Sequence, residues 1–358
     1  MTDKNTRLIH HPYAPPTGFV SPAVPVVKGS TVIFENVAAM RARSWLDRSA
    51  YTYGLHGTPT SFTLEERIAT LEGGTHTMLV ASGLAAITLI DMALLAGGDQ
   101  VLLPNNVYAP NQNFTRTELA AWGIGHAVYD AMDAASLADA LTPATKLVWL
   151  EAPGSVTLEF PDLRTLIATL RERAPQALIA LDNTWGAGIA FDAFALGIDV
   201  TAHALTKYPS GGGDVLMGAV TCRDEALYRK LALCRSRIGH GVGMNDVELV
   251  LRGLPSMALR YAAQDAAARA FAAWCQTRRE FVRVLHPALP GSPGHAHWAS
   301  HCSAAAGLVT VEIDPRFGRD RTDAFVDAMK LFRIGYSWAG PISLVVPYDP
   351  SAIRGASA

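Results

Sequence analysis

The sequence predicts an α/β protein in which helices cover both faces of a large, mostly parallel sheet, followed by a smaller α+β part. Three observations predict this fold class. Short apolar runs alternate with helical stretches from about residue 61 to about residue 245. These runs are continuously apolar, as is typical of parallel strands buried on both faces. The 358 residues are 49% hydrophobic and only 17% charged, which excludes a disordered protein and allows a large core.

The charge balance favours a small-molecule ligand over nucleic acid or a membrane. The 30 basic and 32 acidic side chains leave a formal net charge of −2, so no basic surface is expected. The first residues are polar and lack the apolar core of a signal peptide. No CxxC pair or disulfide framework occurs among Cys222, Cys234, Cys275 and Cys302. We therefore expect a cytoplasmic protein.

Residues 1–50 are predicted to form an irregular arm. Pro12, Pro15, Pro16, Pro22 and Pro25 prevent long regular elements there. Because the arm is also apolar, we expect it to pack on another surface, such as a second subunit.

The expected elements of residues 51–245, the larger predicted α/β domain, begin with a helix. A capping box at residues 63–66 is expected to start it, and Gly73-Gly74 to end it. Further helices are expected over Leu84–Leu95, Gln112–Trp122 and Leu163–Arg173. Strands are expected over Thr77–Val80, Gln100–Leu103, Lys146–Glu151, Ala177–Asp182, Asp199–His203 and Val215–Thr221.

The pattern changes near residue 245, and residues 246–358 are predicted to form a smaller, apparently shortened α+β domain. An alanine-rich helix is expected over Met257–Arg279. A strand over Leu308–Ile313, a helix over Thr322–Phe332 and a strand over Ile342–Val346 are expected to follow.

Three strand ends carry candidate functional residues, and ligands bind at the carboxyl ends of strands in open parallel sheets. Ser82-Gly83 joins a strand to a helix whose free N–H groups could bind phosphate, although a tight turn that needs glycine explains the same residues. Asp182 follows a buried strand and could face a cationic ring nitrogen or simply cap a turn. Lys207 follows the next strand and precedes three glycines; it could form a Schiff base or be an ordinary surface lysine.

Together the three strand ends match the needs of one cofactor, pyridoxal 5'-phosphate. Its phosphate would lie at the helix start, its pyridinium nitrogen at Asp182 and its aldehyde at Lys207.

A series of motifs, in order along residues 30–348, resembles the Cys/Met-metabolism family of pyridoxal-phosphate enzymes. The resemblance implies a fold-type I pyridoxal-phosphate transferase-like architecture. The motifs are Tyr53-Gly54, Gly57-Thr58-Pro59-Thr60, Leu71-Glu72-Gly73-Gly74, Ser82-Gly83, Glu151-Ala152-Pro153-Gly154-Ser155, DNTWGAG from 182, Thr206-Lys207-Tyr208, HPALPGSPGH from 286 and Gly335-Tyr336-Ser337-Trp338.

The resemblance implies roles for nine residues. Lys207 holds the cofactor and moves protons, Asp182 pairs with the pyridine nitrogen, and Tyr108 stacks on the ring. The phosphate is bound by the Gly83 and Leu84 N–H groups, the Thr206 hydroxyl and Tyr53 of a neighbouring subunit, which implies a homotetramer built from site-sharing dimers. Ser337 lies near the substrate carboxylate and Trp338 lies beside the pocket.

The reaction that the resemblance implies is an α,β-elimination that releases L-homocysteine, pyruvate and ammonia from L-cystathionine. A γ-acting relative (a γ-synthase, γ-lyase or sulfhydrylase) shares the cofactor residues and remains an alternative. A pseudoenzyme that binds the cofactor without turnover is another.

Two departures from the family pattern bear on the site. The family often has an arginine two residues after the tyrosine, where this chain has Leu55 followed by His56, a weaker donor for phosphate. The family also continues past the last residue with a strand and helix that carry the arginine for the substrate carboxylate, and Arg354 does not lie in that motif. We therefore expect cofactor binding with poor handling of cystathionine. No metal is expected at His295, His297 and His301, which have no acidic or cysteine ligand beside them.

Overall fold

The structure is a computed structural model that describes residues 3–9, 18, 21–48 and 50–349. Arg354 and the end of the predicted C-terminal domain lie outside these ranges. No helix within them is long and apolar enough to cross a membrane.

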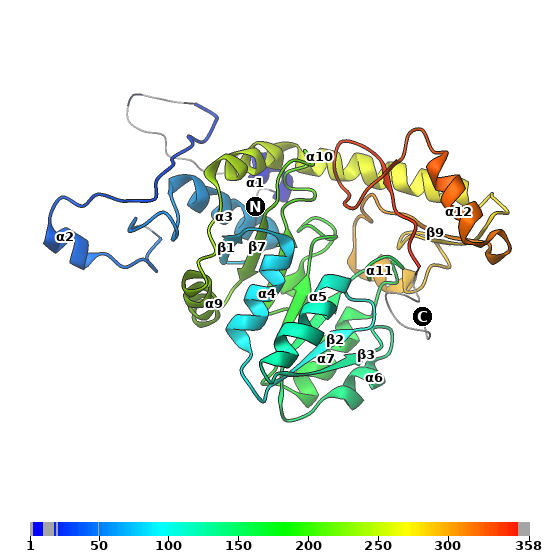
Figure 1. Cartoon of the computed structure of the whole chain (residues 1–358), viewed down its shortest axis with the longest axis horizontal. Helices are drawn as coiled ribbons and strands as arrows, with labels where there is room; N and C mark the ends of the chain where they lie inside the picture. The colour runs from blue at the N-terminus through cyan, green and yellow to red at the C-terminus, as the bar shows by residue number, and fades with distance from the viewer. Residues whose placement is uncertain (1–2, 10–17, 19–20, 49, 350–358) are drawn as a thin grey trace.

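A seven-stranded sheet forms the centre of the molecule and confirms the predicted α/β class (Figure 1). Its strand order is β1-β7-β6-β5-β4-β2-β3, and β7 is antiparallel to both of its neighbours. The other neighbouring strands are parallel. The strands are β1 (His76–Val80), β2 (Gln100–Pro104), β3 (Gly125–Tyr129), β4 (Thr145–Glu151), β5 (Leu178–Asp182), β6 (Val200–Ala204) and β7 (Gly218–Cys222).

Helices cover both faces of this sheet because its strands are apolar on both sides. On one face, α4 (Gly83–Leu94) and α9 (Glu225–Arg237) pack on Val80, Val101 and Trp149. On the other face, α3 (Pro59–Glu72), α7 (Leu163–Arg173) and α10 (Met244–Cys275) pack on a second apolar layer. Shorter helical segments are α5 (Ala109–Phe114), α6 (Ala134–Ala140) and α8 (Ala193–Leu196), with a π-helical turn over Thr115–Leu119.

The C-terminal elements follow α10, which runs from the large sheet to the smaller part of the molecule (Figure 1). This part holds two small sheets, one antiparallel and one parallel. Its elements are β8 (Phe281–Leu285), α11 (His295–His301), β9 (Thr310–Ile313), the 3₁₀ turn Pro315–Phe317, α12 (Gly318–Asp327), β10 (Arg333–Ile334) and β11 (Leu344–Val345).

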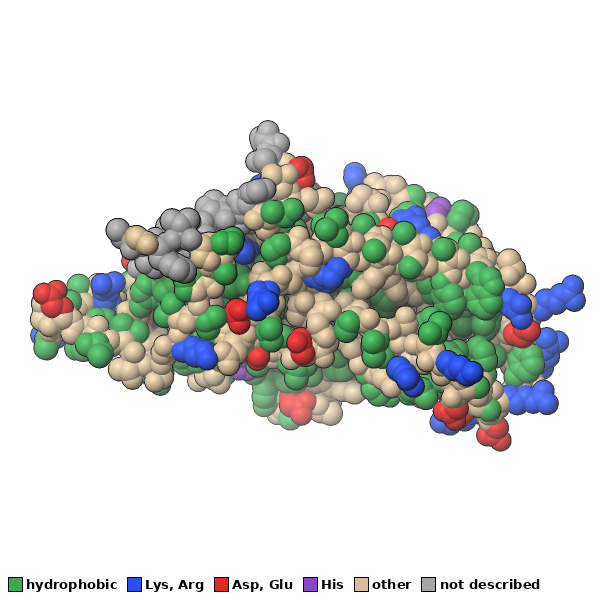
Figure 2. All heavy atoms as spheres, turned by 90° about the horizontal axis from the view of Figure 1, so that it is seen from above, with side chains coloured by type: hydrophobic (Ala, Val, Ile, Leu, Met, Phe, Trp, Pro, Cys, Tyr) green, Lys and Arg blue, Asp and Glu red, His purple; other side chains and the backbone are tan. Residues whose placement is uncertain are grey.

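The N-terminal arm carries two short helices, α1 (Lys4–Ile9) and α2 (Val37–Ala42). Helix α1 packs on α3 and α10, and its Leu8 is buried in the core, whereas the segment with α2 projects from the body at the end opposite α12 (Figures 1 and 2). It is attached near Thr60, whose hydroxyl donates to the Pro25 carbonyl and accepts from the Val27 N–H, both at 2.8 Å. Its tip is apolar and exposed: Ile33 is 91% and Val37 is 56% accessible. The described part of the arm therefore presents apolar surface to its surroundings.

Several predicted element bounds are wrong. The first helix begins after Thr58 at Pro59, and its capping box joins Thr58 to Ser61, while the Thr63 hydroxyl donates within the helix to the Pro59 carbonyl. The long helix begins at residue 244 and ends at 275, so it runs through Pro255. The last helix covers 318–327, not 322–332. The stretch predicted as one helix over 112–122 is α5 followed by a π-helical turn, and β3 was missed because much of this edge strand is exposed.

One buried carboxyl group in α4 makes stability depend on pH. Asp91 is fully buried, and its Oδ1 accepts a hydrogen bond from Trp149 Nε1 at 2.8 Å. Burial raises the pKa of Asp91 to about 7, and the Trp149 hydrogen bond opposes that rise only partly. Because the folded pKa lies above the unfolded value, folding is penalised as pH rises toward and past 7, and the penalty is absent in acid.

We expect Asp91→Asn to stabilise the protein at about pH 8 by on the order of 3 kcal/mol, because the amide resembles the protonated carboxyl. The gain should disappear as the pH falls toward about 4. Urea unfolding at both pH values measures it, with Asp139→Asn on the exposed side of α6 as the control. An equal effect of Asp91→Asn at both pH values would contradict this account.

Candidate functional site

The candidate site lies at one edge of the large sheet, where strand ends from three parts of the chain meet. Asp182 ends β5 and is paired in register with Glu151 of β4 and Ala202 of β6. Because β7 is antiparallel to both β1 and β6, β1 runs parallel to β6, and the start of α4 lies at the same edge. The topology therefore brings the three predicted strand ends together.

The start of α4 packs tightly against the end of β6. The Ser82 hydroxyl accepts a hydrogen bond from the Ala85 N–H at 3.0 Å and caps the helix. A Cβ on Gly83 would lie 2.6 Å from the Ala204 Cβ, so only glycine fits. The N–H groups of the first turn, including those of Gly83 and Leu84, have no acceptor within the helix and can bind an anion.

Lys207 is partly desolvated and is held by the C-terminal part of the chain. Its Nζ donates to the Ser337 Oγ at 2.7 Å and lies 5.6 Å from the centre of the Trp338 ring. Ser337 has a φ of 132°, in a region that side chains rarely adopt, so its backbone is strained to reach this position. Burial lowers the pKa of Lys207, and the charge of Asp182 opposes that shift.

Asp182 is the carboxyl group whose charge acts on Lys207. Its Oδ1 accepts a hydrogen bond from the Thr184 N–H at 3.0 Å. Burial raises the pKa of Asp182, Glu72 adds to the rise, and the Thr184 hydrogen bonds and the charge of His203 oppose it.

Tyr108 and Thr206 complete the cluster. The Tyr108 N–H donates to the Glu151 Oε2 at 2.7 Å, which fixes the start of α5. Burial raises the pKa of the Tyr108 hydroxyl, and the charges of Asp182 and Glu151 add to the rise. The Thr206 Oγ1 accepts from the Met217 N–H at 3.1 Å and lies 3.3 Å from the Met217 carbonyl oxygen.

Tyr53 is also predicted for the site, but its contacts in the described part of the chain lie outside the cluster around Asp182 and Lys207. It forms a bridge with Thr31 of the arm, its ring lies against His56, and it is 49% exposed. His56, the predicted weaker phosphate donor, contacts the Thr52 hydroxyl at 2.9 Å and the Ser236 hydroxyl at 3.3 Å. Burial and the charge of Arg235 lower the pKa of His56.

A buried polar network behind Asp182 was missed at the level of sequence. Glu72, at the end of α3, contacts His203 and Thr201 of β6 and Asn183, the residue after Asp182. From the sequence alone, only a helix end and a family motif are predicted at Leu71-Glu72-Gly73-Gly74. No local pattern could have found the network, because Glu72 lies more than 100 residues before Asn183 and Thr201 along the chain.

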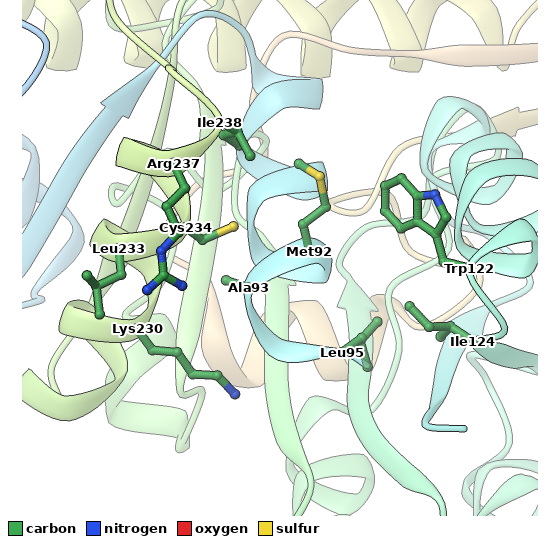
Figure 3. A pocket seen from close by; sticks show the side chains of 10 residues that line it. All are labelled: Met92, Ala93, Leu95, Trp122, Ile124, Lys230, Leu233, Cys234, Arg237 and Ile238. Atoms are coloured by element: carbon green, nitrogen blue, oxygen red, sulfur yellow. The ribbon is translucent and has the colours of Figure 1, made fainter. Parts of the chain in front are cut away.

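A separate groove lies between α4, α9 and the segment that leads into β3 (Figure 3). Met92, Trp122 and Ile238 give it apolar walls, and Lys230 and Arg237 are its cations. It shares no lining residue with the cluster around Asp182 and Lys207. Within the described ranges, no three His, Cys, Asp or Glu side chains are grouped so that they could hold a metal ion.

Comparisons with known proteins agree on one family. Residues 5–351 match the family described as Cys/Met metabolism PLP-dependent enzyme. A cystathionine beta-lyase from Bordetella avium is 37% identical over 347 residues, which cover 96% of this chain and 86% of the relative. Cystathionine beta-lyase MetC from Escherichia coli K12 is 32% identical over 92% of this chain and 83% of the relative. The solved structure of cystathionine gamma synthase from Xanthomonas oryzae pv. oryzae in complex with cystathionine has a TM-score of 0.90 at 28% identity, and the match covers 100% of this chain and 89% of that one.

Proposed function

The chain belongs to the family of Cys/Met metabolism PLP-dependent enzymes, and from this premise we propose that it cleaves the β-carbon–sulfur bond of L-cystathionine. The products are L-homocysteine, pyruvate and ammonia. The observation that carries the reaction type is the set of cystathionine beta-lyases at 30–38% identity over more than nine tenths of this chain. The pyridoxal-phosphate dependence follows from the family itself.

The residues at the sheet edge fit pyridoxal 5'-phosphate. The Gly83 and Leu84 N–H groups at the start of α4 have no acceptor within the helix and could bind the phosphate, and the Thr206 hydroxyl follows the end of β6, against which Gly83 packs. Asp182 would hold the pyridine nitrogen, Lys207 would hold the cofactor covalently, and Tyr108 would cover its ring. When bound, this cofactor withdraws electrons from the α-carbon of an amino-acid substrate.

Lys207 is the group that moves the proton. Because burial lowers the pKa of its amine, a larger fraction is neutral and able to accept a proton near neutral pH. The Ser337 hydroxyl, 2.7 Å from Nζ, orients that amine, and we assign Ser337 and Trp338 to the substrate side of the pocket. Burial of Asp182 opposes its ionisation, so the groups around it decide whether it is charged.

The assay that tests the reaction type separates products by chain length. With L-cystathionine as substrate, we expect the holoenzyme to release pyruvate. A γ-lyase would release 2-oxobutyrate, and a γ-synthase, the reaction of the Xanthomonas oryzae structure, would require an activated homoserine. Release of 2-oxobutyrate, or of no oxo acid at all, would contradict the β-lyase assignment.

We further propose that the enzyme is a homotetramer of site-sharing dimers. The exposed apolar arm supports a subunit contact, with Ile33 91% and Val37 56% accessible. The half-exposed Tyr53 is a residue that one protomer could offer to the site of its neighbour.

Tyr53→Phe removes a hydroxyl that we assign to the phosphate of a neighbouring subunit. We expect the dissociation constant of the cofactor to rise about tenfold, since a hydrogen bond to a charged group contributes roughly 1.5–3 kcal/mol. The matched control is Tyr51→Phe, because the Tyr51 ring stacks on Phe62 within its own chain. Light scattering should give the same tetramer for all three proteins, and a monomer that retains the cofactor would contradict the shared site.

We also propose a cytoplasmic location. It is supported by Cys222, Cys234, Cys275 and Cys302, which are all free thiols.

A further inference from the structure

Four side chains form a buried polar network behind the Asp182 carboxylate. Glu72 is completely buried, and its Oε1 lies 2.8 Å from Nδ1 of His203, which is 1% exposed. Its Oε2 accepts hydrogen bonds from the Asn183 Nδ2 at 2.9 Å and from the Thr201 hydroxyl at 3.0 Å. One carboxyl group therefore joins the end of α3 to both β5 and β6.

The charge on Glu72 is stabilised by these contacts. Burial raises the pKa of Glu72, but the His203 charge and the hydrogen bonds from His203, Asn183 and Thr201 outweigh burial and lower the pKa below its ordinary value. A buried carboxylate needs a compensating charge, and the His203 imidazole is the group in contact that can supply it.

The network also holds the turn that carries Asp182. Asn183 follows Asp182 directly, donates its side-chain amide to Glu72, and donates its backbone N–H to the Ala202 carbonyl at 2.9 Å. The next residue, Thr184, accepts from the Ala204 N–H at 3.0 Å and donates its own N–H to Asp182. The direction of the Asp182 side chain thus depends on contacts that end at Glu72.

Glu72 and His203 affect the ionisation of Asp182 in opposite directions. His203 favours the ionised form of Asp182 and Glu72 disfavours it, while the charge of Asp182 in turn acts on Lys207 and Tyr108. Removing the histidine would leave the negative charge of Glu72 uncompensated beside Asp182.

We propose that Glu72 and His203 are positioning residues of this site: Glu72 holds the 182–184 turn against β6 through Asn183, and His203 offsets the charge of Glu72 so that the Asp182 carboxylate stays available to the pyridine nitrogen of the cofactor. The inference rests on the proposed function, because it takes Asp182 as the partner of that nitrogen. Neither residue needs to touch the cofactor, since Glu72 acts through Asn183 and His203 acts through its charge.

The test compares two variants, His203→Gln and Glu72→Gln, which should differ in how cofactor affinity depends on pH. In His203→Gln the uncompensated Glu72 charge should make Asp182 protonate more readily. We expect pyridoxal phosphate to bind about tenfold more weakly than in the wild type at about pH 6 and nearly normally at about pH 9, since tenfold corresponds to one pKa unit. Glu72→Gln removes the charge that repels the Asp182 carboxylate. Any loss of cofactor affinity relative to wild type should therefore be no larger at about pH 6 than at about pH 9.

Thr201→Val is the matched control, because it removes a neutral hydrogen bond from the same carboxylate. It should lower the unfolding temperature without a pH-dependent change in cofactor affinity. The double variant Glu72→Gln/His203→Gln, which removes both charges, should recover cofactor affinity at about pH 6 to within about threefold of wild type.

Turnover gives a second readout. We expect kcat of His203→Gln to fall about tenfold, with its acidic limb moved to higher pH and KM changed less. The proposal is overturned if His203→Gln and Thr201→Val weaken cofactor binding equally at both pH values, or if neither Glu72→Gln nor His203→Gln folds, because the pair would then be structural. Failure of the proposed function looks different: the wild-type enzyme would release no pyruvate, while the cofactor titrations would still report on Asp182.

Discussion

Lys207→Ala is expected to lower pyruvate release by at least about 10³-fold, because the variant loses both the covalent attachment of the cofactor and the proton-moving amine. The amine lies 2.7 Å from the Ser337 hydroxyl, within a strand-end cluster that also holds Asp182. After borohydride reduction of the wild-type holoenzyme, mass mapping should find the cofactor on the peptide that contains residue 207.

The control for this experiment is Lys230→Ala, which removes a lysine in the separate groove beside α9. Its turnover and its reduced adduct should match the wild type. If Lys207→Ala still formed the reduced adduct, or if Lys230→Ala lost it, the assignment of the covalent residue would be wrong.

Asp182→Asn is expected to keep the cofactor bound when pyridoxal phosphate is supplied in excess, but to reduce kcat about 10²-fold. An amide cannot carry the charge that keeps the pyridine nitrogen protonated, and a hydrogen bond to a charged group contributes roughly 1.5–3 kcal/mol. The amide can still accept the Thr184 N–H, so the turn should survive the substitution. Steady-state kinetics should show the loss in kcat more than in KM, and a visible absorption band should confirm that cofactor is present.

The matched control is Asp192→Asn, which lies ten residues further along the chain and caps α8. Asparagine is an equally good cap, so folding and turnover should be unchanged. An unchanged elimination rate in Asp182→Asn would remove Asp182 from the reaction.

The candidate site residues at strand ends could be selected from the sequence because their local pattern is unusual. Asp182 and Lys207 each follow an apolar run, and the helix over 163–173 has the bounds that its periodicity predicts. β3 was not predictable in this way, because it begins with a glycine and most of its residues are at the surface. Short edge strands of this kind lack the continuous apolar run that identifies the central strands.

The contacts that support the site could not be predicted from local pattern. Glu72 reads as the polar last residue of a helix, and only the folded chain shows that it is completely buried against His203. The Lys207–Ser337 hydrogen bond joins positions 130 residues apart, and the strained backbone at Ser337 leaves no trace in the sequence. Such contacts depend on tertiary structure rather than on periodicity.

The position of β7 between β1 and β6 sets an order for synthesis and folding. β1 has no partner in the sheet except β7, which lies about 140 residues later, so residues 76–80 must wait unpaired until residue 222 has left the ribosome. Gly83 at the start of α4, which we propose binds the phosphate, lies against Ala204 of β6, so this contact joins the same two parts of the sheet that β7 links. Non-local pairing of this kind slows folding and exposes an apolar strand in the meantime. The nascent chain therefore carries an apolar strand unpaired for a long part of its translation, and a chain that ends before residue 218 lacks the strand that joins β1 to β6.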